Sequence, residues 1–231
     1  MKLLIITGAS SGIGLSTAER FLAEGYTVVN LSRRRCPATA VNHINCDLSV
    51  AGFLDTITGQ LTPLLKDSDQ ICLIHNASRL EHDSAVETAS NHFREVLETN
   101  LVAPNTLNYF IIPYMKAGSS VLYVGSTLSE KAVPGSFTYV VSKHAQLGMM
   151  RATCQDTAGR HIHTLAVCPG FTDTEMLRTH IPPEALESVA GLSSFGRLVE
   201  PAEIASVLFY GAQHPVLNGT VVHANLGQIE S

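Results

Sequence analysis

The chain has 231 residues, carries a formal net charge of −5 at pH 7 and is 45% hydrophobic. A chain of this length buries about 70% of the surface that its unfolded form exposes, so a single domain over residues 1–231 needs neither disulfides nor a metal to fold. The mild negative charge gives no reason to expect a nucleic-acid partner, and no apolar run approaches the roughly 20 residues that span a membrane. Five cysteines without a C-x-x-C pair favour the reducing cytoplasm.

The chain begins with a predicted strand, a glycine-rich turn and a helix. Residues 2–7 are mostly aliphatic, as expected of a central parallel strand, and a helical pattern runs to about Glu24. Between them Gly8, Gly12 and Gly14 follow the spacing G-x-x-x-G-x-G. Glycines at such a junction allow a tight turn and a close approach of backbone N–H groups to a pyrophosphate. The junction predicts a dinucleotide site, and the alternative is a glycine-rich turn without a ligand.

Apolar strand-like runs then alternate with longer helical patterns, which is typical of βαβ units. The sequence therefore predicts an α/β fold, a single-domain Rossmann-type doubly wound parallel sheet with helices on both faces. We expect a long helix over residues 91–115, with Pro104 and Pro113 affecting its ends or kinking it. Residues 171–195 are expected to form a flexible substrate flap, irregular or with short helices. The remaining strands are predicted at residues 26–31, 43–46, 70–75, 120–124, 161–167 and 220–223.

The strand ends carry candidate catalytic groups, because ligands bind beyond the carboxyl ends of strands in such a sheet. Ser126 follows a predicted strand, and Tyr139 stands four residues before Lys143, which places both on one helix face. An ammonium favours the phenolate, so we expect Lys143, with a cationic nicotinamide, to bring the pKa of Tyr139 to about 7. A surface tyrosine–lysine pair is the alternative for this spacing alone. Together with the serine and the phosphate loop, the pair predicts acid–base catalysis.

These motifs, in this order, resemble those of the short-chain dehydrogenase/reductase family over nearly the whole chain. The resemblance implies that Ser126, Tyr139 and Lys143 are catalytic, and that Asn100 holds a water linking Lys143 to solvent. For Asn100 the alternative is an asparagine bonded to backbone. The resemblance implies cofactor binding by Gly8, Ser10, Ser11, Gly12, Ile13, Gly14, Ser32, Arg33, Asp47, Asn76, Ala77, Tyr139, Lys143, Pro169, Gly170, Thr172 and Thr174.

The resemblance implies a specific role for three of these residues. Asp47 would contact the adenine, Lys143 would also bind the ribose hydroxyls, and Thr174 would bind the carboxamide.

The chain departs from the family pattern after the fourth strand. His75 and Ser78 stand where relatives usually carry asparagine and glycine. Ser78 adds a side chain beside the expected cofactor path.

The residues after the second strand indicate which nicotinamide cofactor is used. An acid there would bond the ribose hydroxyls of NAD, whereas a basic residue favours the 2′-phosphate of NADP. The chain has Ser32 and Arg33 and no acid. This predicts NADP(H), with Arg33 on the phosphate and Ser32 assisting, and NAD(H) as the alternative. Ser11 stands where many NADP-preferring relatives carry a second basic residue, and a solvated arginine run is the competing interpretation.

The resemblance implies an NADPH-dependent reductase of a small, fairly apolar ketone, aldehyde or diketone, with Tyr139 as proton donor and Ser126 stabilising the oxygen. Its substrate would lie against residues 127–137 and 171–195. Alternatives are an NAD(P)-dependent alcohol dehydrogenase, a reductase of pterin-like or acyl-thioester-linked substrates, and a non-catalytic NADP(H)-binding redox sensor. The resemblance also implies a homodimer or homotetramer. His161 and His163 alternate along a predicted strand, but two imidazoles without a third ligand predict no metal site.

Overall fold

The computed structural model describes residues 1–229 and contains a parallel sheet of seven strands. The strand order is β3-β2-β1-β4-β5-β6-β7, so the chain reverses direction across the sheet between β1 and β4. In open parallel sheets a ligand crevice forms at such a reversal, outside the carboxyl ends of the strands. The strands are β1 (Lys2–Thr7), β2 (Thr27–Ser32), β3 (Asn42–Asn45), β4 (Gln70–His75), β5 (Ser120–Val124), β6 (His163–Pro169) and β7 (Thr220–Ala224).

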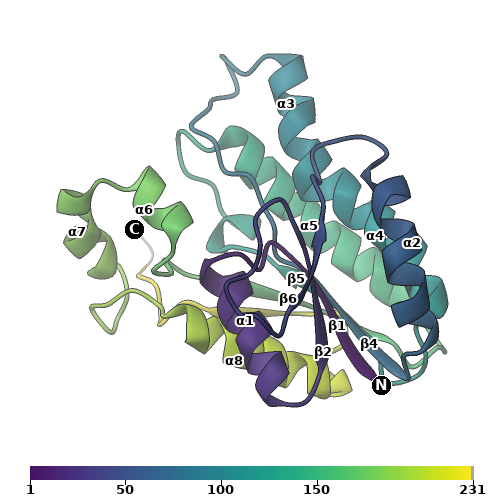
Figure 1. Ribbon diagram of the computed structural model, residues 1–231. Coiled ribbons are helices and arrows are strands. Elements are labelled where there is room, and N and C mark those ends of the chain that lie inside the picture. The colour runs from purple at the N-terminus through teal and green to yellow at the C-terminus, as the bar shows by residue number, and fades with distance from the viewer. Residues whose placement is uncertain (230–231) are drawn as a thin grey trace.

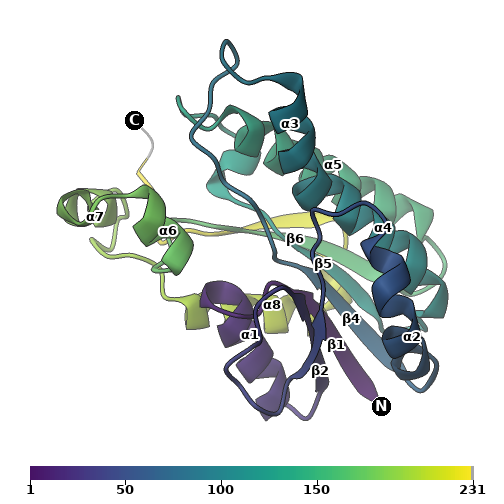
Figure 2. The same cartoon turned by 45° about the horizontal axis from the view of Figure 1, so that its top comes forward.

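Helices cover both faces of the sheet, as predicted (Figure 1). Helices α1 (Gly12–Ala23) and α8 (Pro201–Gln213) lie together on one face. Helices α2 (Phe53–Lys66), α4 (Ala103–Ile111) and α5 (Phe137–Asp156) lie on the other, and Figure 2 shows the sheet between the two layers. Within residues 1–229 no helix is long and apolar enough to cross a membrane.

The side chains of β1 divide the core into two parts. Leu3 and Ile5 pack with apolar residues of α2, α4 and α5, whereas Leu4 and Ile6 pack with those of α1 and α8. All four side chains are fully buried. Because successive side chains of a strand point to opposite faces, a continuous apolar run is what a strand covered on both faces requires.

The long helix predicted over residues 91–115 is confirmed, because residues 90–114 are helical without a gap, but the type of helix changes inside it. Helix α3 (Ser90–Leu97) leads into a π-helical turn over Glu98–Val102, and α4 follows. A further 3₁₀ turn covers Ile112–Tyr114. Pro104 follows the π-helical turn and has no N–H to offer the carbonyl oxygen of Asn100, four residues before it, and that oxygen accepts from Gln146 instead. Asn100 is fully buried inside the π-helical turn.

Residues 171–195 contain short helices, in agreement with the sequence. Helix α6 (Glu175–His180) and helix α7 (Leu186–Ala190) stand beyond the carboxyl edge of the sheet, away from the two helical layers (Figure 1).

The predicted alternation of two histidines along β6 is wrong. The strand begins at His163, and His161 lies in the preceding turn with a φ of 55°. Within residues 1–229 no three His, Cys, Asp or Glu side chains are placed so that they could hold a metal ion.

Candidate active site

A pocket of about 1390 Å³ opens at the carboxyl edge of the sheet, at the end predicted from the topology. It is lined by the segments that follow β1 to β6 and by α6. All the site residues predicted from the sequence line this pocket except Asn100. The predicted residues that line it are Gly8, Ser10, Ser11, Gly12, Ile13, Gly14, Ser32, Arg33, Asp47, Asn76, Ala77, Ser126, Tyr139, Lys143, Pro169, Gly170, Thr172 and Thr174.

The glycine loop at the start of α1 can accept an anion. Gly8 and Gly12 adopt positive φ values of 72° and 55°, and a Cβ on Gly14 would lie 2.3 Å from the carbonyl oxygen of Gly8. Ser11 is the N-cap residue of α1, yet its side chain makes no capping hydrogen bond, and the first turn has no acid. The N–H groups at this helix end are therefore left for another acceptor, and a pyrophosphate fits that position.

The loop after β4 holds the glycine loop in place. The side-chain amide of Asn76 donates to the carbonyl oxygens of Thr7 and Gly8, at 2.9 and 3.0 Å. The Thr7 hydroxyl accepts from the backbone N–H groups of Asn76 and Ala77, both at 3.0 Å. Nearby, the Ser78 hydroxyl is buried at the pocket wall and has no hydrogen-bond partner within residues 1–229. An orphaned polar atom at this place is consistent with a bound nucleotide.

The other departure from the family pattern, His75, belongs to the core. Its Nε2 lies 2.8 Å from Asn108 Oδ1, and burial lowers the pKa of His75 to about 4. The imidazole is therefore neutral at physiological pH, and it serves packing and hydrogen bonding beneath the site.

The end of β2 and the two residues after it bring Ser32, Arg33 and Arg34 to the pocket. The Ser32 hydroxyl donates to the carbonyl oxygen of Arg34 at 2.6 Å, and Arg33 is exposed beside it. After β3, Asp47 Oδ1 accepts from the hydroxyl and the backbone N–H of Ser49, and these bonds hold the pKa of Asp47 below its usual range.

Arg34, which sequence reasoning passed over, reaches across the pocket to Glu175 of α6 and to Ser11. Its place in the same arginine run was a signal that could have singled it out.

Three predicted catalytic side chains meet on the pocket wall. Tyr139 lies in the first turn of α5, and Lys143 follows one turn later; both are buried. The Ser126 hydroxyl lies next to that of Tyr139 and acts to lower its pKa. Ser126 Oγ also accepts from the backbone N–H of Leu128 at 3.1 Å. Lys143 Nζ lies 5.4 Å from the centre of the Tyr139 ring.

Without a bound nicotinamide the pKa of Tyr139 is not lowered, and the predicted fall, which includes the effect of that cation, stays a prediction. Burial raises the pKa of Tyr139 to about 12, and the neighbouring Ser126 hydroxyl opposes this only in part. Burial also lowers the pKa of Lys143 to about 8. The Lys143 ammonium donates to the carbonyl oxygen of Val124 at 2.8 Å and to Gln146 Oε1 at 3.1 Å, rather than to the phenol. At neutral pH Tyr139 therefore keeps its proton.

Asn100 lies behind the pocket and is bonded to backbone, as the alternative interpretation expected. Its side chain accepts from the N–H of Arg79 at 2.8 Å and donates to the carbonyl oxygen of Arg79 at 2.9 Å and to Ser142 Oγ at 2.9 Å. The backbone carbonyl of Asn100 accepts from Gln146 Nε2 at 3.0 Å, so Gln146 joins it to Lys143. Sequence reasoning missed Gln146, although its spacing of three residues from Lys143 places both on one helix face.

The segment after β6 forms the opposite wall. Thr172 is buried and its hydroxyl donates to the carbonyl oxygen of Gly170 at 3.0 Å. Thr174 caps α6 by accepting from the N–H of Leu177 at 3.2 Å. A Cβ on Gly12 would lie 3.1 Å from the Thr174 methyl carbon, so α6 begins close against the glycine loop.

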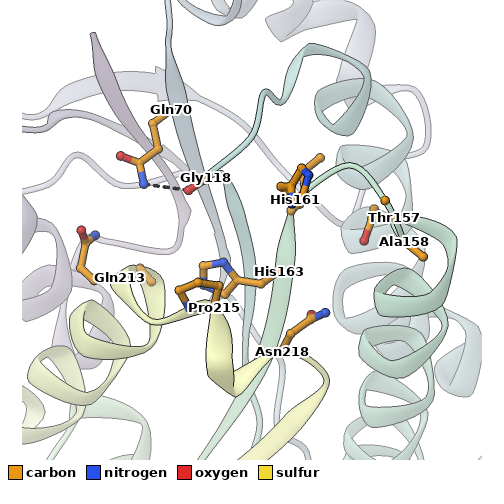
Figure 3. Close-up of a pocket in the computed structure, with 12 residues that line it drawn as sticks. Gln70, Gly118, Thr157, Ala158, His161, His163, Gln213, Pro215 and Asn218 are labelled. Carbon is orange, nitrogen blue, oxygen red and sulfur yellow. Dashed lines mark hydrogen bonds between the residues drawn. The ribbon is translucent and has the colours of Figure 1, made fainter.

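A second hollow, of about 580 Å³, lies at the amino ends of β4 and β6, away from these groups (Figure 3). Its polar side chains support the backbone. Gln70 donates to the carbonyl oxygen of Gly118 at 2.7 Å, His163 Nε2 lies 2.9 Å from that of Gly211, and Asn218 accepts from the N–H of Thr164 at 2.8 Å. None of the predicted site residues lines it. The pocket at the carboxyl edge is therefore the candidate active site.

Known proteins share both the sequence pattern and the fold. The pattern described as short chain dehydrogenase matches residues 2–185. A 3-oxoacyl-(acyl-carrier-protein) reductase of Thermotoga maritima is 28% identical over 229 residues, which cover 90% of this chain and 89% of the relative. Aldohexose dehydrogenase of Thermoplasma acidophilum superposes with a TM-score of 0.90 and 26% identity, over 98% of this chain and 93% of that one. Angucycline C-6 ketoreductase LanV, solved with bound NADP, superposes with a TM-score of 0.87 and 27% identity. This match covers 98% of this chain and 95% of LanV. The chain thus belongs to the short-chain dehydrogenase/reductase family, and it is an NAD(P)-dependent oxidoreductase.

Proposed function

We propose that the protein is an NADPH-dependent reductase of a small, fairly apolar ketone, aldehyde or diketone. The observation that carries the proposal is the meeting of Ser126, Tyr139 and Lys143 on the wall of a pocket that also holds the glycine loop. When bound, a reduced nicotinamide supplies a hydride to the carbonyl carbon. The protein then has to deliver a proton to the carbonyl oxygen, so that an alcohol forms.

Tyr139 delivers that proton. Because its pKa is raised to about 12, the phenol is protonated at physiological pH, as an acid in a reduction must be. Ser126 Oγ already accepts a bond from the N–H of Leu128, which leaves its own hydrogen to donate to the substrate oxygen. Two hydroxyl donors on one oxygen stabilise the negative charge that develops there.

Lys143 supports the tyrosinate that is left after proton transfer. Its ammonium is buried under the Tyr139 ring, where a positive charge favours the anion more strongly than in water. Gln146 and the carbonyl oxygen of Val124 hold the ammonium in this place. We assign the ribose hydroxyls of the cofactor to Lys143 as well, its carboxamide to Thr174 and its adenine to Asp47.

The pocket lining supports an apolar substrate. Leu128, Val133, Met176, Leu177 and Leu192 all line it, from the loop after β5 and from the flap over residues 171–195. The relatives support a carbonyl reaction, since one is a 3-oxoacyl reductase and one a ketoreductase. The first of these favours a second candidate, the reduction of a 3-oxo group in an acyl-thioester-linked substrate.

The cofactor and the assembly belong to the same proposal. The absence of an acid after β2 and the presence of exposed Arg33 at the pocket favour NADP(H). We further propose that residues 1–231 act as one domain in a homodimer or homotetramer, which sedimentation of the purified protein would reveal.

The test is a titration with NADPH and NADH followed by turnover. Purified protein is mixed with NADPH and a panel of ketones, aldehydes, diketones and 3-oxoacyl thioesters, and NADPH loss is followed by absorbance. We expect tighter binding of NADPH and turnover of at least one apolar carbonyl. Binding without turnover across the panel would favour a redox sensor, and equal or tighter NADH binding would overturn the cofactor assignment.

A further inference from the structure

An ion pair crosses the mouth of the candidate active site. Arg34, two residues after β2, makes two parallel hydrogen bonds to the Glu175 carboxylate at the start of α6, at 2.8 and 3.1 Å. The same guanidinium donates to the Ser11 hydroxyl of the glycine loop at 3.3 Å. Three segments that are distant in the sequence thus meet at one guanidinium, and all three residues line the pocket.

The place of this guanidinium matters for nucleotide recognition. In a dinucleotide fold the adenosine ribose lies between the glycine loop and the end of β2, and a nearby arginine accommodates a 2′-phosphate. Arg34 contacts the glycine loop itself, at Ser11. It therefore lies between the two segments that bracket the ribose.

The chain holds Arg34 in this place through buried groups. Asn30 of β2 is fully buried, and its Oδ1 accepts from the N–H of Ala9 in the glycine loop at 2.9 Å. Its amide donates to Ser32 Oγ at 2.8 Å, and Ser32 in turn donates to the carbonyl oxygen of Arg34 at 2.6 Å. A chain of three hydrogen bonds thus connects the glycine loop to the backbone of Arg34.

We propose that Arg34 recognises the 2′-phosphate of NADP(H), and that Glu175 is an internal competitor for the same guanidinium. Glu175 occupies the edge of the guanidinium formed by Nη1 and Nη2, and a phosphate that accepts from the same two N–H groups must displace it. The competition weakens only ligands that carry a 2′-phosphate. The inference rests on the proposed preference for NADP(H) and adds two residues to it.

Glu175 is suited to this role because it stays ionised. Hydrogen bonds from Arg34 and then from Ser11 hold the pKa of Glu175 below its usual range, so the carboxylate is an anion throughout the physiological range. The same helix provides a matched ion pair outside the pocket: Arg178 donates to Asp173 at 2.6 and 2.8 Å. This second pair shares the chemistry of the first and lacks its contact with the glycine loop.

The test uses adenosine fragments, which separate recognition from turnover. Binding of adenosine 2′,5′-bisphosphate and of adenosine 5′-monophosphate is measured by calorimetry for the full-length wild type and for Arg34→Ala, Glu175→Gln, Arg33→Ala and the control Asp173→Asn. Loss of charge-assisted bonds predicts that Arg34→Ala weakens the bisphosphate about 10- to 100-fold. Glu175→Gln frees Arg34 from an exposed ion pair, so it should strengthen binding of the bisphosphate about threefold. The affinity for the monophosphate should change by no more than about twofold in every variant, because this ligand has no 2′-phosphate. In the control variant the affinity for the bisphosphate should also stay within about twofold, because Asp173 is not part of this ion pair.

Two failures can be told apart. If the wild type does not prefer the bisphosphate, the proposed NADP(H) preference itself is wrong. If the wild type prefers it, but Arg34→Ala keeps that preference while Arg33→Ala removes it, the assignment to Arg34 is wrong and the proposed cofactor stands. Unchanged affinity in Glu175→Gln, with folding verified by a thermal melt, would refute the competition.

Discussion

The lysine beneath the catalytic tyrosine should destabilise the fold at neutral pH. Lys143 is only 2% exposed, and burial lowers its pKa from 10.5 to about 8. Below pH 8 the ammonium is charged in both the folded and the unfolded chain, so the full penalty for burying it is present. A fall of this size corresponds to about 3 kcal/mol.

The sign of the pH dependence follows from proton binding. Between pH 8 and pH 10.5 the folded protein has released the Lys143 proton while the unfolded chain still holds it. Stability rises with pH wherever the unfolded state binds more protons. The contribution of Lys143 to the free energy of unfolding should therefore increase by about 2.5 kcal/mol between pH 7 and pH 10.

The perturbation that isolates this contribution is Lys143→Met. Methionine keeps much of the apolar stem but cannot titrate, and the bonds lost to Val124 and Gln146 change stability by an amount that does not depend on pH. Urea unfolding of both proteins at pH 7, 8, 9 and 10 gives the difference in free energy of unfolding at each pH. As the pH rises, the free energy of unfolding of the wild type should increase relative to that of Lys143→Met.

A constant difference over this range would refute the reasoning, because it would mean that the amine keeps its proton in the folded protein. The matched control is Lys66→Met at the exposed end of α2, which changes the same side chain without removing a buried charge.

Three further outcomes are expected. Tyr139→Phe should lower turnover about 10²- to 10⁴-fold, since the proton donor is lost, while fluorescence titration shows NADPH binding retained; full turnover would exclude Tyr139 as the acid. Gln146→Leu removes an acceptor that favours the Lys143 ammonium, so the alkaline limb of a kcat–pH profile should move to lower pH, and an unmoved limb would contradict this. Gly14→Ala should abolish nucleotide binding, because its Cβ would lie 2.3 Å from a carbonyl oxygen. The control Gly59→Ala, with nothing within 4 Å in α2, should raise the free energy of unfolding by about 0.5–1 kcal/mol in urea.

The sequence predicts the fold well because the signals are local. The apolar run in β1 requires burial on both faces, and the glycine spacing requires a tight turn with positive φ at Gly8 and Gly12. Each of these constraints acts within a few residues. The alternation of strands and helices then leaves few possible topologies, since crossovers between parallel strands are right-handed.

What the sequence misses depends on contacts that form only in the folded chain. Arg34 and Glu175 are 141 positions apart and meet because the segments after β2 and β6 end at the same edge of the sheet. The π-helical turn at Asn100 coincides with buried bonds to Arg79 and Ser142, neither of which is near it in sequence. Spacing reveals the ammonium near Tyr139 but not the depth of burial, and in the protein without cofactor burial dominates and raises the pKa of Tyr139.

The distribution of unfavourable groups gives a separate argument for which edge of the sheet is functional. Among residues 1–229, Lys143 is the one lysine, arginine, aspartate or glutamate that is buried. A cation in that position opposes folding at neutral pH, and the orphaned Ser78 hydroxyl and the π-helical turn at Asn100 lie close to the same pocket. Natural proteins depart from the rules of stable folding mainly where function requires it. The hollow at the amino ends of the strands also has an orphaned polar atom, His163 Nδ1, but Gln70 and Asn218 bond the backbone there and it holds no buried Lys, Arg, Asp or Glu of residues 1–229. The buried charge therefore points to the carboxyl edge independently of any motif.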